Sequence, residues 1–286
     1  MDRRLMLWPT TGTGEDLAIA LQDVINRTSA VHGGQREMVE SYLAWVDAGV
    51  ETLQRKLSPR DLERLLTSPR YWSIAANPEP TAANVRGANA ELQHRKRLLE
   101  DTAAVIRRAC SALSLGRDAS LVLVDSNVWI DQTVSLAKVP WFQLVSEIPQ
   151  SRVSETRELR LIVPILLVDE LDGVGHRNGR SRQRAINVAR WLHGHLRGRG
   201  GSPVAFASSP HGGEITLQLL MDPLHHVKLP NNDDELLDRL ARLRDFIGHP
   251  PARCFFLTQD VNAALRAESL GISSHLMSAP ERPKDD

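Results

Sequence analysis

The stretch LVLVDSNVWI, residues 121–130, decides the fold. Four apolar residues run directly into Asp125, which is followed by the small polar pair Ser126 and Asn127. A short, wholly apolar run is typical of a strand buried on both faces of a parallel sheet. A carboxylate at the end of such a strand is costly unless hydrogen bonds, a cationic side chain or a metal ion compensate its charge. Residues 121–125 therefore predict a central strand that ends in a compensated acid.

Outward from this strand, residues from 117 onward alternate between strand and helix patterns. The predicted strands are 120–125, 159–164, 203–208, 214–221 and 253–260, and the predicted helices are 165–174, 180–196, 232–247 and 261–271. Asn232 is the expected cap of the third helix. Strands that alternate with helices indicate an α/β domain with a mostly parallel central sheet flanked by helices.

Residues 1–116 read as an all-α N-terminal domain. Apolar residues recur at helical spacing, for example Leu17, Leu21 and Val24. Ser58, followed by Pro59, is a strong helix start signal. We find no set of residues there that would carry chemistry, so the role of this domain is left open. The tail 278–286 is expected to be disordered.

Composition limits the class of protein. The 286 residues include 35 basic and 35 acidic side chains, so net charge points to no partner. Cys110 and Cys254 lack disulfide or zinc-ligand spacing, which favours a reducing compartment. No apolar run approaches the roughly 18 residues of a membrane span, and no signal peptide is evident. These features predict a cytoplasmic protein without a membrane partner.

Acidic residues follow the predicted strands at several places. Carboxyl ends of parallel strands meet at one edge of the sheet, where ligands of open α/β sheets bind. Crowded carboxylates repel one another and hold protons, and a hard cation such as Mg²⁺ or Mn²⁺ removes the repulsion. The acids expected at this edge are Asp125, Glu170, Asp233, Asp234 and Asp260.

Four segments resemble, in order, the four motifs of the PIN domain nuclease family. They are VDSNVWI, VPILLVDELDGV, NDDELLDRL and LTQDVNAALRAESLGI. The resemblance covers about residues 118–276 and is closer to the larger bacterial PIN domain proteins than to the shortest toxins. It implies a PIN-like nuclease domain over residues 117–277.

The resemblance further implies a metal-dependent endoribonuclease that hydrolyses phosphodiester bonds of single-stranded RNA, with one or two Mg²⁺ or Mn²⁺ ions. The implied metal-binding and catalytic residues are Asp125, Glu170, Asp234 and Asp260. Asp233 is the competing choice for the third position. Asn127 and Thr258 are expected to support the ligands.

A segment without Asp or Glu extends from Gly173 to Gly213 and is rich in arginine. Arginine contacts phosphates in a bidentate manner and stacks on bases, as recognition of single-stranded RNA requires. The expected RNA contacts are Arg177, Arg180, Arg182 and Arg184. Alternatively, the segment is the solvated face of a helix and contacts no partner. An antitoxin or regulatory protein, and a second copy of the chain, are further partners that the sequence leaves open. His225 and His226 are read as surface residues.

Two other functions fit parts of the pattern. A haloacid dehalogenase-type phosphatase also begins from a strand-end Asp, but it needs a second Asp where this chain has Asn127. A non-catalytic RNA-binding or scaffold protein with a PIN-like fold would have no reason to keep four acids.

Overall fold

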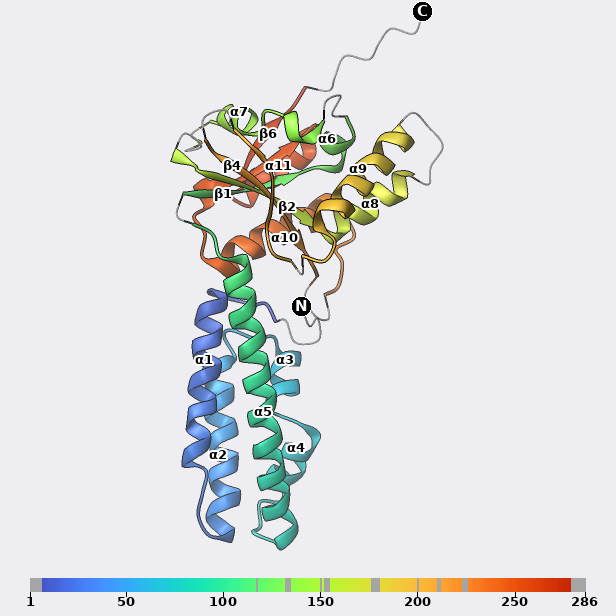
Figure 1. Ribbon diagram of the computed structural model, residues 1–286. Coiled ribbons are helices and arrows are strands. Elements are labelled where there is room, and N and C mark those ends of the chain that lie inside the picture. The colour runs from blue at the N-terminus through green and yellow to red at the C-terminus, as the bar shows by residue number, and fades with distance from the viewer. Residues whose placement is uncertain are drawn as a thin grey trace, which may run out of the picture. The chain divides into compact units, whose positions relative to one another are not determined.

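The computed structural model describes residues 7–116, 118–131, 135–149, 151, 155–175, 181–199, 201–209, 212–222 and 226–278 (Figure 1). The chain divides into two compact units, one that ends at Ser111 and one that begins at Ala112. None of the helices in these ranges combines the length and apolar character that a membrane crossing needs.

The first unit is helical, as the sequence predicts. Its elements are α1 (Gly14–Asn26), η2 (Arg27–Ala30), α2 (Gln35–Leu53), α3 (Pro59–Leu65), α4 (Pro69–Ala76) and α5 (Ala82–Leu113). The expected stripe of α1 is buried, because Leu17, Leu21 and Val24 are fully inaccessible to solvent. The hydroxyl of Ser58 accepts a hydrogen bond from the Asp61 backbone N–H and caps α3.

Glu91, a buried acid on α5, is hydrogen-bonded to other side chains of the first unit. The Glu91 carboxylate accepts hydrogen bonds from Ser68 Oγ at 2.8 Å and from Arg95 Nε at 2.9 Å. Arg95 also donates from Nη1 to the Arg64 carbonyl at 2.6 Å. These partners satisfy the buried charges and join α5 to α3 and to the start of α4.

The second unit alternates strands and helices. Its elements are β1 (Ala119–Val124), α6 (Ser126–Asp131), η3 (Leu136–Lys138), α7 (Trp141–Ser146), β2 (Glu158–Pro164), α8 (Ile165–Gly175), α9 (Ser181–Leu196), β3 (Val204–Ser208), β4 (Glu214–Leu220), α10 (Asn232–Ile247), η5 (Pro251–Arg253), β5 (Cys254–Thr258), α11 (Val261–Ser269) and β6 (Ser273–Leu276). The predicted mixed α/β class is confirmed.

One six-stranded sheet runs through this unit in the order β3-β4-β2-β1-β5-β6. All neighbouring strands are parallel except β3 and β4. From β1 the chain first moves to β2 and the strands beyond it, and later crosses to β5 and β6 on the other side. This reversal makes the carboxyl ends of β1 and β5 a topological switch point, where open α/β sheets place their ligand sites.

The structure contains several elements that the sequence did not predict. The helices α6 and α7 and the edge strand β6 had no predicted counterpart. Strand β3 pairs antiparallel with β4, and its register shifts between Ala205 and Ala207. The expected helix cap was displaced by one position, because Asn231 rather than Asn232 caps α10.

Buried polar side chains of the sheet bind the end of α5. Arg160 Nη1 donates to the Ser114 carbonyl at 3.0 Å, and Gln218 Nε2 donates to the Ala112 carbonyl at 2.9 Å. Arg160 and Gln218 are 5% and 1% exposed. Carbonyls at a helix C-terminus lack intrahelical partners, so these bonds satisfy both the helix end and the sheet. Ala112 and Ser114, whose carbonyls accept these bonds, lie within the second unit.

These bonds predict the stability of fragments. A fragment of residues 107–286 should be more stable than one of residues 116–286, because the shorter one leaves the Arg160 and Gln218 donors buried without those carbonyls. The expected difference in free energy of unfolding is about 0.5–1.5 kcal/mol for each lost hydrogen bond, because Arg160 Nη1 and Gln218 Nε2 keep their other acceptors, Gln218 Oε1 and the Gly201 carbonyl. Urea unfolding of both fragments measures it, and equal midpoints and slopes would show that the contacts contribute nothing.

Candidate active site

Asp125 lies directly after β1 and is 4% exposed. Its Oδ2 accepts a hydrogen bond from Thr258 Oγ1 at 2.9 Å, across from the end of β5. Its Oδ1 is 3.3 Å from the Ser126 hydroxyl, and the backbone N–H groups of Ser126 and Asn127 also bond to the carboxylate. Burial nevertheless raises the pKa of Asp125, because the hydrogen bonds offset only part of the lost hydration.

Glu170 approaches the same place from α8. Burial raises its pKa, and the negative charges of Asp125 and Asp233 raise it further. Hydrogen bonds from the side chains of Asn232 and Ser126 act in the opposite direction. The side chain of Asn232, expected to cap α10, thus contacts the acid of α8 instead. The reason is that the neighbouring Asn231 accepts the Asp233 and Asp234 backbone N–H groups at 2.7 and 3.3 Å.

Asp233 and Asp234 have different environments, although they are adjacent on α10. Burial and the charges of Asp125 and Asp260 raise the pKa of Asp233. Asp234 instead forms an ion pair in which one nitrogen, Arg266 Nη1, lies 2.6 Å from Oδ1 and 2.7 Å from Oδ2. Asp233 is therefore the carboxylate whose ionisation the other acids oppose, whereas Asp234 is paired with a cation on α11.

Asp260 caps α11 at the end of β5. Its Oδ1 accepts the Asn262 and Ala263 backbone N–H groups at 2.7 and 3.3 Å. Its own backbone N–H donates to Thr258 Oγ1 at 3.0 Å. Thr258 is fully buried and so connects Asp125 to the turn that carries Asp260. Of the two residues expected to support the ligands, Thr258 contacts Asp125 with its side chain, whereas the Asn127 side chain is exposed.

Among these acids, the charges of Asp125 and Asp233 act on Glu170, and the charges of Asp125 and Asp260 act on Asp233. Within the described residues, no three His, Cys, Asp or Glu side chains are close enough to hold a metal ion together as they stand. Their chemistry still fits a hard cation, because three carboxyl groups have raised pKa values and two of these are raised in part by acidic neighbours. Mg²⁺ keeps several of its waters and needs only one or two direct carboxylate ligands. The ligand set itself stays a prediction.

A family model of the PIN domain matches residues 122–277. The match spans more than half of the chain. The chain belongs to the PIN domain family. PIN domains have a nuclease fold, are generally hydrolases of nucleic acids and typically use divalent metals. No curated protein sequence matches the chain.

The arginine-rich segment lies partly on α9. Arg182 donates to the Gly175 carbonyl at 3.0 Å, and Arg184 lies 4.0 Å from Asp131; both are otherwise exposed. Arg177 and Arg180 lie outside the described residues. Further along α9, the Trp191 ring is 6.4 Å from the ring of Trp129, which is on α6, the helix that begins after Asp125.

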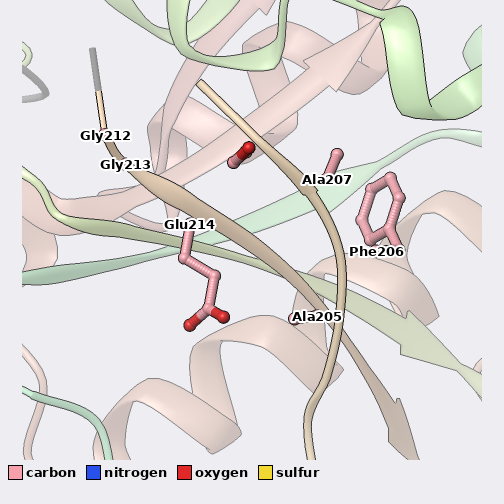
Figure 2. A pocket seen from close by; sticks show the side chains of 7 residues that line it. Ala205, Phe206, Ala207, Gly212, Gly213 and Glu214 are labelled. Carbon is pink, nitrogen blue, oxygen red and sulfur yellow. The ribbon is translucent and has the colours of Figure 1, made fainter. Parts of the chain in front are cut away.

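A shallow pocket of about 400 Å³ lies on β3 and β4, formed by residues 205–208 and 212–214. Figure 2 shows that Phe206 and Glu214 point to different sides of this hairpin. None of the predicted acids lines it. Because Glu214 pairs with Glu158 at the start of β2, the pocket is at the amino end of the parallel strands and not at the edge that carries Asp125.

A buried ionic group supports the loop before α10. Glu235 and Arg239 are 2% and 1% exposed and are joined by hydrogen bonds of 2.7 and 2.8 Å. Glu235 also accepts the Leu229 backbone N–H at 2.8 Å, and His226 Nε2 lies 2.6 Å from it. His226 is therefore a mostly buried partner of Glu235 and not a surface residue as expected. His225 lies outside the described residues.

The raised pKa values predict how pH affects the metal-free protein. Asp125, Glu170 and Asp233 have folded-state pKa values above their ordinary 3.8, 4.5 and 3.8. Their contribution to stability is full below about pH 4 and is lost as pH rises through the raised values. Asp125→Asn removes one such group, so the variant should gain stability relative to wild type as pH rises from about 4.

Urea unfolding in EDTA at a series of pH values measures this difference. The matched control for the loss of an acidic side chain is Asp169→Asn, which changes an exposed acid next to Glu170 on α8. A difference between Asp125→Asn and wild type that is constant with pH would contradict the account.

Proposed function

We propose that the second unit is a metal-dependent endoribonuclease that hydrolyses phosphodiester bonds of single-stranded RNA. The observation that carries the proposal is the convergence of Asp125, Glu170, Asp233 and Asp260 at the switch point of a PIN domain sheet. The family match favours this nuclease activity over the phosphatase alternative. The cytoplasmic location expected from the sequence belongs to the same proposal.

The proposal assigns the third acidic position to Asp233. Asp125 and Glu170 supply carboxylate oxygens from β1 and α8, and the electrostatic coupling of Asp233 to Asp125 and Asp260 supports its place beside them. Asp260 uses one oxygen to cap α11 and has a second for a metal ion or its water. Thr258 fixes the orientation of the Asp125 carboxylate, and Ser126 and Asn232 fix that of Glu170.

Mg²⁺ or Mn²⁺ bound by these residues would lower the pKa of a water molecule and stabilise negative charge on the reacting phosphate. The protein's own contribution is to hold the carboxylates in place before the ion arrives. The arginines of α9 would then bind phosphates elsewhere along the strand.

The role of the first unit is proposed to be regulation or targeting of the nuclease. Its buried charges are satisfied within the unit itself, which supports a role outside the chemistry. An antitoxin, another regulatory protein or a second copy of the chain would be its partner.

The metal proposal predicts a contrast between two adjacent acids. Asp233→Asn should abolish the thermal stabilisation by Mn²⁺ and reduce cleavage of a single-stranded RNA by more than the roughly 10- to 100-fold that loss of a supporting residue costs. Asp234→Asn should retain the Mn²⁺ stabilisation, because its carboxylate is paired with Arg266. Thermal melts with and without Mn²⁺, and RNA cleavage at matched folded concentration, test both variants.

Two controls make this test decisive. Asp238→Asn makes the same chemical change further along α10, where the acid is paired with Arg242. Wild-type cleavage must also stop in EDTA and return with excess Mg²⁺. Cleavage that persists in EDTA, in protein free of host nucleases, would refute the metal mechanism, and metal binding without any cleavage would favour the scaffold alternative.

The arginine-rich segment predicts steep salt dependence of RNA affinity. Each phosphate contact on a single strand contributes about 0.7 to the slope of log affinity against log salt. Replacing Arg182 and Arg184 together by Gln should lower that slope by roughly 0.7 to 1.4 and leave Mn²⁺ stabilisation intact. An unchanged slope and affinity would identify this part of α9 as a solvated face.

A further inference from the structure

The acidic edge contains a cation that the proposed function has not yet used. Arg266 lies on α11, and its guanidinium holds Asp234 through two hydrogen bonds from Nη1. Asp233 and Asp260 are near enough that their charges, after that of Asp234, favour the protonated form of Arg266 and raise its pKa. A permanent positive charge is therefore placed at the rim of the acids.

The exposure of the ion pair between Arg266 and Asp234 allows the two side chains to separate. Both side chains are substantially exposed, 45% for Arg266 and 40% for Asp234. Exposed ion pairs contribute little to stability, because water and salt screen them. The geometry that a guanidinium uses for a carboxylate is also the one that it uses for a phosphate. A phosphodiester can therefore replace Asp234 at little cost.

The site also needs such a cation. A polyanion that approaches a group of carboxylates is repelled, and a bound divalent ion offsets this repulsion only at its own position. A guanidinium beside the ion would bind the oxygens that the ion does not reach.

We propose that Arg266 binds a phosphodiester of the single-stranded nucleic acid at the acidic edge, and that Asp234 holds Arg266 in place while no strand is bound. This assignment rests on the proposed function. Asp234 is then a competitor of the substrate for Arg266 and not a metal ligand.

The assignment predicts opposite effects for the two partners. Arg266→Gln should weaken the affinity for a short single-stranded RNA roughly tenfold, as loss of a charge-assisted hydrogen-bonding contact does, and lower the salt slope by about 0.7. Asp234→Asn should strengthen the affinity, because Arg266 is released. The Asp234→Asn gain should vanish when Arg266→Gln is also present.

The experiment measures RNA affinity by fluorescence anisotropy, using the full chain with Ca²⁺ in place of Mg²⁺ so that the strand is not consumed. Thermal stabilisation by Mn²⁺ is measured for each variant and should not fall. The matched controls are Arg242→Gln and Asp238→Asn, which break a comparable exposed ion pair on α10 with a 2.7 Å contact. Neither control should reproduce the effects at Arg266 and Asp234.

The outcomes separate the two proposals. If wild type binds and cleaves RNA but Arg266→Gln binds as tightly as Arg242→Gln, the assignment of Arg266 is wrong and the nuclease proposal stands. If Asp234→Asn loses the Mn²⁺ stabilisation, Asp234 is a ligand and the assignment is again wrong. If wild type neither binds nor cleaves RNA, both proposals fail.

Discussion

A hydrogen bond from Thr258 to Asp125 joins β1 and β5, the two strands between which the strand order of the sheet reverses. Much of the arrangement of the second unit depends on this bond. A nearly inaccessible carboxylate at the end of β1 must have donors, and β5 supplies a buried hydroxyl at 2.9 Å. The same hydroxyl accepts the Asp260 backbone N–H, which orients the turn into α11. One threonine thus fixes an acid on β1 and the start of a helix that follows β5.

The charges at this edge are arranged unequally. Burial raises the pKa values of Asp125, Glu170 and Asp233. Acidic neighbours raise those of Glu170 and Asp233 further. Asp234 and Arg266 are exposed and neutralise each other. The edge therefore has a more buried group of acids and an exposed ion pair, and the charge of Arg266 in that pair offsets part of the rise in the pKa of Asp233.

The sequence predicts the parts of this arrangement that depend on local pattern. The apolar run before Asp125 indicates a buried strand because no polar face interrupts it, and strands that alternate with helices indicate a parallel sheet. The antiparallel pairing of β3 was not predicted, although the short connection between β3 and β4, residues 209–213, is too short for a parallel crossover and could have revealed it. Helix α6 is too short to show a period, and β6 is short and partly polar.

The site was less predictable than the sheet. Asn231 and Asn232 are chemically identical, so the sequence cannot tell which one caps α10 and which one contacts Glu170. Arg266 gives no signal at all, since its partner is 32 residues away and the two meet only because α10 and α11 pack together. Residues whose roles depend on such packing are beyond pattern analysis of one sequence.

The irregular register of β3 bears on how copies of this chain can meet. An edge strand presents unpaired backbone groups that can add a strand from another molecule, and a regular, extended edge is the best template for such pairing. Here one edge is shifted between Ala205 and Ala207, and the other is the four-residue β6. Both edges are therefore poor templates for pairing with a strand of another copy, which protects the sheet against edge-to-edge aggregation.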